Sequence, residues 1–312
     1  MAQPIPLSAL PLADLFRLAQ QLRAQMRAEP TELVYREILR REQQEAQVKW
    51  ALAWLLLARG AYEEAWPLYE ARTEVPATGI KRPRFSFPEW DGAAVGSILL
   101  YPEQGFGDQM MFARYAPRLA ERGVRVTMIA PRPLARLFSH LPVDILVGEE
   151  GLAVPRRDAW AMVGSLPRRL GVEASGGYLP GAPGGKGTGI VTRGASTYVR
   201  DAQRSLPDAL AAELLSLPGA VSLDPQDTGA ADFEDTRRII LGLERVITVD
   251  TAAAHLAAAM GKPTWVLLAH DPDWRWGWSG ETSAWYASAR LFRQTAPGDW
   301  RGVIDRVKDA LG

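Results

Sequence analysis

Asp250, Thr251 and His255 combine side chains that could together bind an anion. They follow an apolar run at Val246–Val249, which predicts a buried strand. Three alanines at 252–254 favour a helix that begins near Thr251, and the free N–H groups and dipole of such a helix start bind anions. Asp250 is a candidate N-cap, and His255 shares a helix face with Thr251, four residues earlier. Amides, hydroxyl and imidazole suit a diphosphate. The alternative is that Asp250 only caps the helix and that His255 packs under a loop.

The turn Gly105-Phe-Gly-Asp108 could place a second reactive group beside a ligand. It follows an apolar run at Ser97–Tyr101, and its glycines, Gly105 and Gly107, would let a ligand approach the backbone closely. Asp108 would lie in the first turn of the next helix, where its carboxylate could accept a proton from an attacking hydroxyl. The alternative is that Asp108 only interacts with the helix dipole. A nicotinamide-binding loop is not favoured, because Met110 takes the place of the last glycine of that motif.

Arginines and tryptophans in the second half of the chain supply further candidate groups. Arg193 and Arg204 lie near the first predicted strand of that half and could neutralise a leaving diphosphate, or could be solvated loop charges. Trp274 and Trp276 could stack on a base or a sugar, or could pack between domains. Neither a G-x-S-x-G elbow nor a P-loop motif occurs, so a hydrolase or a nucleoside triphosphatase has no local support.

Composition argues against several other kinds of chemistry. The 312 residues carry a formal net charge of zero, which argues against nucleic acid or an anionic membrane as the main partner. There is no cysteine, so disulfides, zinc thiolates and thiol nucleophiles are excluded. The histidines, His140, His255 and His270, lack metal-ligand spacing, so we expect no metal site. Prolines near the N-terminus and a longest apolar run of only Ala51–Ala58 predict neither a signal peptide nor an integral membrane segment, and we expect a cytoplasmic protein.

The first part of the chain is predicted to be helical. Residues 1–75 carry apolar side chains at helical spacing, and the two helices predicted around Gly60 partly match the tetratricopeptide pattern. Such a segment would be either a helical cap on the next domain or a docking surface for a protein partner. Residues 76–93, rich in proline, arginine and aromatic residues, are predicted to be a linker.

The remainder alternates between predicted strands and helices, as is typical of a parallel doubly wound sheet. We expect a Rossmann-like domain at 94–173, a linker rich in glycine and proline at 174–188, and a second Rossmann-like domain at 189–312. Its closing helix would be capped by Asp299. Ligands of such sheets bind at the carboxyl ends of strands, where both chemical clusters fall. The predicted strands are Ser97–Tyr101, Val124–Ala130, Val143–Val147, Ala159–Val163, Gly189–Thr192, Ala220–Leu223, Val246–Val249, Thr264–Leu268 and Arg290–Arg293, and the predicted helices are Gln109–Arg122, Leu134–Leu141, Pro207–Ser216, Phe233–Leu243 and Thr251–Met260.

The run from Tyr101 to Pro117, Tyr-Pro-Glu-Gln-Gly-Phe-Gly-Asp-Gln-Met-Met-Phe-Ala-Arg-Tyr-Ala-Pro, resembles a known signature. It is similar to the E-Q-G-x-G-D-x-x-x-F-x-R-Y-x-P pattern of bacterial tetratricopeptide-linked glycosyltransferases, relatives of the heptosyltransferase-like glycosyltransferase family 9. Further matches follow in order over residues 60–312: Trp66–Arg72, Trp90–Gly92, Arg204-Ser205, Asp232–Thr236, Ile247–Leu256, Gly261–Pro263, Pro272–Trp276, Arg290–Gln294 and Pro297–Trp300.

The resemblance implies a GT-B fold, in which two Rossmann-like halves hold a nucleotide-sugar in the cleft between them. It implies that Asp108 is the general base and that the nucleotide-sugar is a substrate, with no metal or cofactor. The donor would be held by Asp250, Thr251 and His255.

Two departures from the family touch the donor pocket. The family often has Trp-x-Gly-Asn-Pro where this chain has Thr192–Ser196, and the heptosyltransferase D-T-G-x-x-H has glycine where this chain has Ala252. We expect an inverting, metal-independent glycosyltransferase that transfers a sugar from a nucleotide-sugar to a hydroxyl of a protein or glycan acceptor. The alternatives are a catalytically silent GT-B module that holds a protein through its N-terminal helices, and a sugar-nucleotide epimerase.

Overall fold

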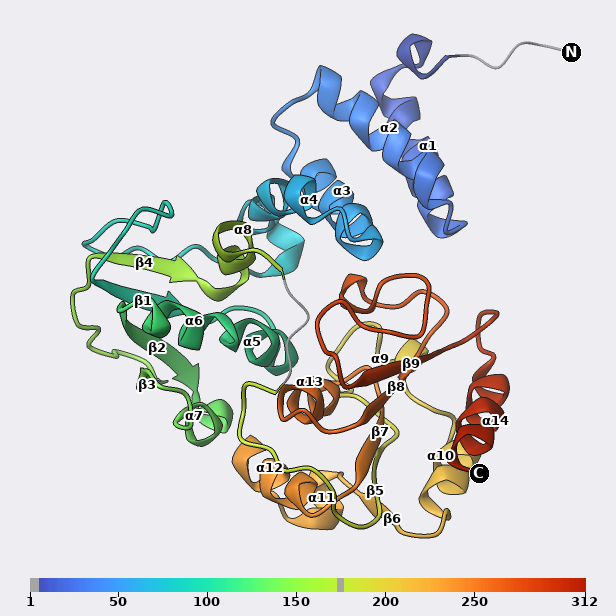
Figure 1. The fold of residues 1–312 in the computed structure, drawn as a ribbon. Coiled ribbons are helices and arrows are strands. Elements are labelled where there is room, and N and C mark those ends of the chain that lie inside the picture. Colours follow the sequence, from blue (N-terminus) through green and yellow to red (C-terminus); the bar gives the residue numbers. More distant parts are fainter. Residues whose placement is uncertain (1–5, 173–176) are drawn as a thin grey trace, which may run out of the picture. The chain divides into compact units, whose positions relative to one another are not determined.

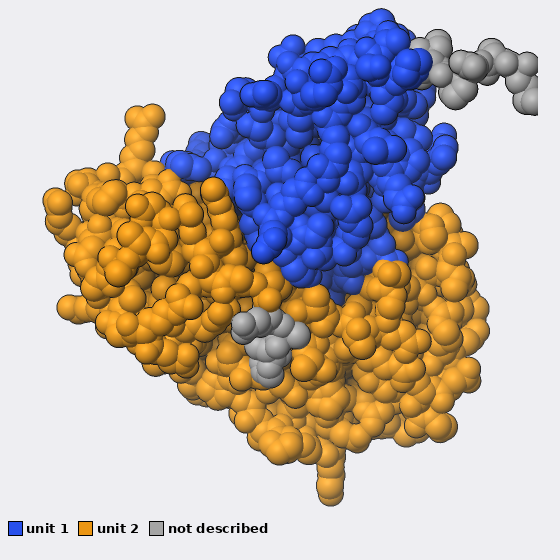
Figure 2. All heavy atoms as spheres, turned by 45° about the horizontal axis from the view of Figure 1, so that its top comes forward, with its two compact units in different colours: residues 1–82, 273–278 blue, residues 83–272, 279–312 orange. Residues whose placement is uncertain are grey.

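The computed structural model describes residues 6–172 and 177–312, and the chain divides into two compact units. Unit 1 comprises Met1–Arg82 and Asp273–Trp278, and unit 2 comprises Pro83–Pro272 and Ser279–Gly312. Figure 2 shows unit 1 in blue and unit 2 in orange. Residues 273–278, which the sequence placed in the C-terminal domain, therefore belong to the unit built by the N-terminal helices.

In the described residues of unit 1, every regular element is a helix (Figure 1). Helices α1 to α4 each pack against the next one in the chain. This agrees with the predicted helical segment, while the tetratricopeptide assignment stays a prediction. The α-helices are α1 (Leu12–Ala24), α2 (Ala28–Arg41), α3 (Ala46–Arg59) and α4 (Tyr62–Tyr69), and short 3₁₀ turns lie at Leu7–Ala9, Glu70–Thr73, Pro76–Thr78 and Trp274–Trp276. Their apolar positions recur at helical spacing and form a core of Leu15, Ala19, Leu22, Val34, Ile38 and Val48.

Unit 2 contains two parallel sheets, of which the first has four strands in the order β3-β2-β1-β4 (Figure 1). The central strand β1 is apolar and fully buried at Ile98, Leu99 and Leu100, as is usual for a parallel sheet covered on both faces. The strands are β1 (Ser97–Tyr101), β2 (Arg125–Pro131), β3 (Asp144–Gly148) and β4 (Ala159–Met162). The helices are α5 (Phe106–Ala113), α6 (Tyr115–Glu121), α7 (Arg132–Phe138) and α8 (Leu166–Leu170), with a 3₁₀ turn at Val163–Ser165.

The second sheet has five parallel strands in the order β6-β5-β7-β8-β9. Asp299 caps the closing helix as predicted, because its side chain accepts a hydrogen bond from the Gly302 N–H group at 2.9 Å. The strands are β5 (Thr188–Val191), β6 (Ala220–Ser222), β7 (Arg245–Val249), β8 (Thr264–Leu268) and β9 (Ala289–Arg293). The helices are α9 (Asp201–Arg204), α10 (Asp208–Leu215), α11 (Pro225–Thr228), α12 (Phe233–Leu241), α13 (Ala252–Ala259) and α14 (Trp300–Leu311).

These two sheets confirm the predicted α/β class. Every predicted strand is present, with bounds that shift by one residue at most. None of the helices in the described ranges combines the length and apolar character that a bilayer crossing requires.

One predicted helix, Gln109–Arg122, is wrong as a continuous element. The structure has two helices there, α5 and α6, with Arg114 between them. Pro117 explains the break, because a proline lacks the N–H group of the helical ladder and its ring clashes with the carbonyl four residues earlier. The helix also begins earlier than predicted, at Phe106, with Gly105 as its capping residue.

The glycine- and proline-rich stretch after the first sheet is packed against the second sheet's helices. Residues 174–176 of the predicted linker lie outside the described residues. From Tyr178 onward the backbone is anchored, since the N–H groups of Tyr178 and Leu179 both donate to the Ala259 carbonyl, at 2.8 and 2.9 Å. A side chain at Gly181 would overlap the Met260 carbonyl. Here glycine permits close approach to the end of α13.

A buried lysine fastens the same region. Lys262 is 1% exposed. Its ammonium group donates to the carbonyls of Gly184 and Leu241, at 2.6 and 3.2 Å, and to that of Leu243. The ammonium group thus donates to carbonyls at the end of α12 and in the connection before β5. It has three N–H donors, more than any neutral side chain has, so it can bind all three carbonyls at once.

Candidate functional site

Both chemical clusters lie where the strand order of a sheet reverses. In the first sheet this point is between β1 and β4, and in the second it is between β5 and β7. The chain leaves each of these strands in opposite directions at such a point, which opens a crevice at the carboxyl ends where ligands bind. Gly105–Asp108 follow β1, and Asp250–His255 follow β7.

Helix α13 begins at Ala252, and Thr251 is its capping residue. This corrects the prediction that Asp250 is the N-cap. Thr251 has extended backbone angles, φ −142° and ψ 173°, and its hydroxyl lies 3.1 Å from that of Thr248. Within residues 6–172 and 177–312, the Thr251 side chain accepts no hydrogen bond from the first turn. The first-turn amides therefore have no such cap, and this leaves them suited to an anion.

The turn between β7 and α13 includes Asp250, one residue more than predicted, and Arg204 contacts this residue. The Arg204 Nη1 donates to the Asp250 carbonyl at 2.8 Å, which holds Asp250 in the turn between β7 and α13. The Arg204 Nε donates to Asp201 at 3.0 Å, and the guanidinium lies 4.4 Å from the centre of the Tyr198 ring. The structure thus brings a well-anchored cation to the start of α13.

Arg193 is not brought to the same place. Its guanidinium forms an ion pair with Asp208, and both side chains are largely exposed. Exposed pairs of this kind contribute little and exchange partners readily. A second arginine of the loop after β5 is more firmly held: Arg200 donates to the Asp271 carboxylate at 2.7 Å and to its carbonyl at 2.8 Å.

His255 and Gly107 bring the two clusters together. Helix α5 packs against α13. A Cβ atom on Gly107 would lie 2.6 Å from Cδ2 and 3.3 Å from Nε2 of His255, and 3.4 Å from the Cα atom of Ala252. Only glycine allows this approach, because real Cβ contacts below 3.0 Å essentially do not occur. The N-terminal turns of α5 and α13 therefore meet at the His255 ring.

The other side of the His255 ring contacts Tyr286. The Nδ1 atom lies 2.9 Å from the Tyr286 hydroxyl, and the two residues are 4% and 1% exposed. Burial, and then the neighbouring Tyr178, raise the pKa of Tyr286 well above its ordinary value, so the phenol is protonated. The sequence gives no signal for Tyr286 beyond its place in an aromatic-rich stretch.

Arg114 lies behind this pair, in a cage of aromatic rings. Its guanidinium carbon lies 5.0 Å from the centre of the Tyr178 ring, 5.4 Å from that of Trp285 and 4.7 Å from that of Tyr286. Its Nη1 donates to the Trp285 carbonyl at 2.6 Å, and its Nε donates to the Met111 carbonyl at 2.8 Å. A buried cation thus contacts both halves of unit 2 and lies over Tyr286, which contacts His255.

Asp108 occupies the third position of α5. One of its carboxylate oxygens, Oδ2, accepts a hydrogen bond from the Gly105 N–H group at 3.0 Å. This is the helix-start role that the sequence left open as an alternative. A carboxylate has about four acceptor positions, so the bond from Gly105 does not by itself occupy the whole group.

The turn before α5 holds an unusual backbone conformation. Gln104 has φ +62°, a left-handed conformation that costs a non-glycine residue about 1–2 kcal/mol. Glu103, 6% exposed, accepts a hydrogen bond from the Gly164 N–H group at 2.7 Å, across the crevice between β1 and β4. That bond fixes the end of β1 and holds the strained turn. The sequence motif contains both residues, although their types alone do not show this role.

Trp274 and Trp276 are buried within unit 1, 2% and 3% exposed. The Trp274 ring lies edge-on to Trp66 and to Tyr69, with centroids 5.8 and 5.9 Å apart. Both indoles therefore have their surfaces covered by protein, and we do not include them in a ligand site.

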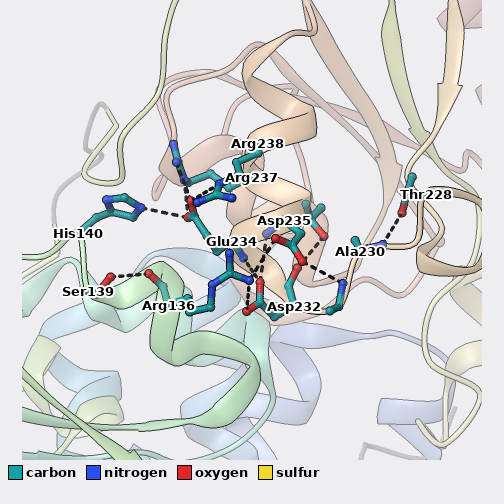
Figure 3. Close-up of polar contacts among 12 residues, drawn as sticks. Arg136, Ser139, His140, Thr228, Ala230, Asp232, Glu234, Asp235, Arg237 and Arg238 are labelled. Carbon is teal, nitrogen blue, oxygen red and sulfur yellow. Dashed lines mark hydrogen bonds and ion pairs between the residues drawn. The ribbon is translucent and has the colours of Figure 1, made fainter.

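A cluster of ion pairs joins α7 of the first sheet to α12 of the second (Figure 3). Arg136 contacts Asp232 and Asp235 at 2.9 and 3.1 Å, and His140 Nε2 lies 3.0 Å from Glu234. A hydrogen bond from Arg237, and then one from His140, lower the pKa of Glu234 to about 2 despite its burial. The sequence matched this stretch to the family but did not predict that it would bridge the two halves.

Among the described residues, no group of three or more histidines and carboxylates could hold a metal ion. The metal-independent mechanism itself stays a proposal.

Solved structures that are similar to this chain include heptosyltransferases and other glycosyltransferases. E. coli heptosyltransferase WaaC with ADP-2-deoxy-2-fluoro heptose is 14% identical, at a TM-score of 0.48 over 69% of this chain and 98% of that one. The glycosyl transferase family 9 structure from Veillonella parvula DSM 2008 is 9% identical, at a TM-score of 0.47 over 68% and 89%. The iron-containing dodecameric glycosyltransferase TibC from enterotoxigenic E. coli H10407 is 13% identical, at a TM-score of 0.46 over 73% and 78%.

Protein FlbA of Caulobacter vibrioides is a more similar sequence. It is 25% identical over 331 aligned positions, which cover 85% of this chain. The chain spans only 55% of the length of that protein. No protein-family model matches the chain.

Proposed function

We propose that unit 2 is a GT-B glycosyltransferase that moves a sugar from a nucleotide-sugar to a hydroxyl of a protein or glycan acceptor, with inversion and without a metal or cofactor. The observation that carries this proposal is the meeting of two helix starts at Gly107 and His255. Each helix follows a strand at a point where its sheet reverses order. A candidate base from one sheet and an anion-binding turn from the other therefore face the same place.

The donor diphosphate would lie at the start of α13. The first-turn amides, the Thr251 hydroxyl and the His255 imidazole supply hydrogen-bond donors, and Arg204 supplies a positive charge beside Asp250. The hydrogen bonds and the charge interaction that these groups make would strengthen as negative charge develops on the leaving diphosphate. Loss of one such donor typically lowers a rate by about 10²–10³. Arg193 would contribute to diphosphate binding only if it left its exposed partner, Asp208.

The acceptor would be activated by Asp108. In the proposed step the acceptor oxygen attacks the anomeric carbon, its proton passes to the Asp108 carboxylate, and the bond from that carbon to the diphosphate oxygen breaks. The attack comes from the face opposite the leaving group, which inverts the configuration. The bond from Gly105 fixes the carboxylate at the start of α5.

Donor binding is the first part to test. Purified protein would be melted with UDP, GDP, CDP, CMP, ADP and their sugars, first in a chelator and then with a divalent metal. Stabilisation by one nucleotide in the chelator, lost in His255→Ala and kept in His140→Ala, would support the site at α13. His140 is a matched control because it follows α7 and contacts Glu234, not the start of α13. Absence of a shift with every nucleotide would contradict the proposal and favour a silent protein-binding module.

The transfer step needs a second measurement. With the donor class known, acceptor libraries of glycans and proteins would be screened for sugar transfer. Asp108→Asn should abolish transfer and leave the nucleotide-induced shift in melting temperature unchanged. A fully active Asp108→Asn variant would rule out Asp108 as the base. Turnover of the donor to an epimer without any acceptor would replace transfer by epimerisation.

A further inference from the structure

The loop between β5 and α10 contains the departure from the Trp-x-Gly-Asn-Pro run, at Thr192–Ser196. Thr192, Ala195 and Ser196 stand where that run has tryptophan, asparagine and proline, whereas its glycine is kept as Gly194. The contacts of this glycine therefore indicate which task the altered loop still performs.

Gly194 lies against the ion pair of Arg204 and Asp201. A Cβ atom on Gly194 would lie 2.2 Å from Asp201 Oδ1, 2.3 Å from Arg204 Nη2 and 2.5 Å from Arg204 Nε, so any other residue would displace the pair. The Gly194 N–H group donates to Ser205 Oγ at 3.1 Å, and that hydroxyl donates to Asp201 Oδ2 at 3.1 Å. The two carboxylate oxygens of Asp201 are thus fixed, one by Arg204 and the other by Ser205.

Arg204 is itself held at three places. Its Nε donates to Asp201 at 3.0 Å, its Nη1 donates to the Asp250 carbonyl at 2.8 Å, and the Tyr198 ring covers the guanidinium at 4.4 Å. The side chain is only 19% exposed. A guanidinium has five N–H donors, and three of those on Arg204 have no acceptor among the residues that the structure describes. Because largely buried donors are usually paired, this arrangement suits an anion from outside the chain.

We propose that Asp201 is a positioning residue, which holds the Arg204 guanidinium in one orientation at the start of α13 so that its remaining N–H groups bind the donor diphosphate. Gly194 and Ser205 fix Asp201 for this task. The inference rests on the proposed function for the identity of the anion. The changes in Thr192–Ser196 leave the arrangement in place, because none of the hydrogen bonds that hold Arg204 uses the altered side chains.

The alternative is that Asp201 only neutralises the charge of Arg204. The two interpretations predict changes of opposite sign. A carboxylate beside the site repels a diphosphate, so removal of a merely neutralising Asp201 should strengthen nucleotide binding. If Asp201 positions Arg204, its removal lets the guanidinium rotate, and binding weakens although the site becomes more positive.

Two variants of Asp201 remove the same charge but differ in hydrogen bonding. Binding of UDP, GDP, CDP and ADP would be measured by titration calorimetry in a chelator. Asp201→Ala should bind the preferred nucleotide about tenfold more weakly, the loss expected for one charged hydrogen bond. Asp201→Asn keeps an acceptor for the Arg204 Nε–H group and should recover part of the affinity. Unchanged or tighter binding by Asp201→Ala would overturn the proposal.

Asp271→Asn is the matched control. Asp271 is the carboxylate partner of Arg200, another arginine of the same loop, at 2.7 Å. Loss of this carboxylate changes the net charge equally but leaves Arg204 in place, so nucleotide affinity should stay at the wild-type value. If Asp271→Asn weakened binding as much as Asp201→Ala, the effect would belong to the charge of the loop, and the positioning role of Asp201 would be refuted.

The orientation of Arg204 can be observed without any nucleotide. In protein labelled with ¹⁵N in arginine, the Arg204 Nε–H signal is the one that vanishes in Arg204→Lys. We expect an order parameter for this group of about 0.85 in the wild type, as for a rigid backbone, and below about 0.6 in Asp201→Ala. The other arginine signals report whether the variant is folded. An equally rigid Arg204 in folded Asp201→Ala would contradict the inference.

The two measurements distinguish failure of this inference from failure of the proposed function. If no nucleotide binds to the wild type, but Arg204 is rigid there and mobile in Asp201→Ala, the proposed function fails and Asp201 still positions Arg204. If a nucleotide binds to the wild type and to Asp201→Ala with equal affinity, the inference alone fails.

Discussion

Gly107→Ala should separate the two helix starts on which the candidate site depends. The added Cβ atom would lie 2.6 Å from Cδ2 of His255, and its other close neighbour, at 3.4 Å, is the Cα atom of Ala252. The ring cannot withdraw freely, because Tyr286 holds Nδ1 from behind at 2.9 Å. The variant must therefore break that bond or push α13 away from α5.

The expected change in the free energy of unfolding of Gly107→Ala follows from two opposing effects. Overpacking of a close contact costs about 1–3 kcal/mol, whereas alanine in place of glycine in a helix gains about 0.5–1 kcal/mol. We expect a net loss of about 1–2 kcal/mol in the free energy of unfolding, which lowers the melting temperature by about 2–8 °C for a unit of this size. If the displacement falls on His255, nucleotide affinity drops about tenfold for each 1.4 kcal/mol.

Gly242→Ala is the matched control for this substitution. Gly242 has φ −78° at the end of α12, and a Cβ atom there would meet the Ile239 carbonyl at an ordinary 3.6 Å. This variant should melt with the wild type or slightly above it and should bind nucleotide normally. Calorimetry would compare the melting temperatures of the two variants, and nucleotide titration would compare their affinities. If Gly107→Ala were as stable as Gly242→Ala and bound nucleotide equally well, the close approach of α5 and α13 would be refuted.

Three other predictions concern the remainder of the chain. Lys262→Met should lower the free energy of unfolding by about 2–4 kcal/mol in urea denaturation, since it strands buried carbonyls at the end of α12, and a variant of wild-type stability would show that these carbonyls find other donors. Glu234 has a pKa lowered to about 2, so its carboxylate stabilises the fold above the ordinary value of 4.5, and that contribution, up to about 3 kcal/mol, should disappear as the pH falls from about 4.5 to 2. When the free energy of unfolding is measured against pH, Glu234→Gln should not show this loss of stability. If the wild type and Glu234→Gln lost stability identically in acid, the lowered pKa of Glu234 would be contradicted. Trp274→Ala should destabilise unit 1 by about 3–5 kcal/mol while nucleotide binding persists, whereas loss of nucleotide binding with an intact unit 1 would return Trp274 to the ligand site.

The sequence predicts the sheets well because their signal is local. A buried parallel strand must be a short apolar run between turn residues, so β1 and β8 can be delimited to the residue. The order of strands and helices then leaves few topologies, and the carboxyl ends of β1 and β7 follow as the place for a ligand. The chemistry-bearing residues at those ends could accordingly be named from the sequence.

The sequence does not predict contacts between residues that lie far apart in the chain. The cap of α13 moves from Asp250 to Thr251 because Arg204, 46 positions earlier, holds the Asp250 carbonyl. Tyr286 contacts His255 across 31 positions, and nothing in the spacing of an aromatic-rich loop predicts that partner. Pro117, by contrast, is a local signal for the break between α5 and α6.

The assignment of Asp273–Trp278 to unit 1 has a consequence for how the protein is made. The ribosome completes Met1–Arg82 long before it reaches this segment, about 190 residues later. At about 5–20 residues per second, the wait is about 10–40 s. During that time the nascent helices lack Trp274, and the surfaces of Trp66 and Tyr69 that it covers stay open to solvent or to a chaperone. The N-terminal unit is thus the first to be synthesised, yet it can reach its final packing only after most of unit 2 has been translated.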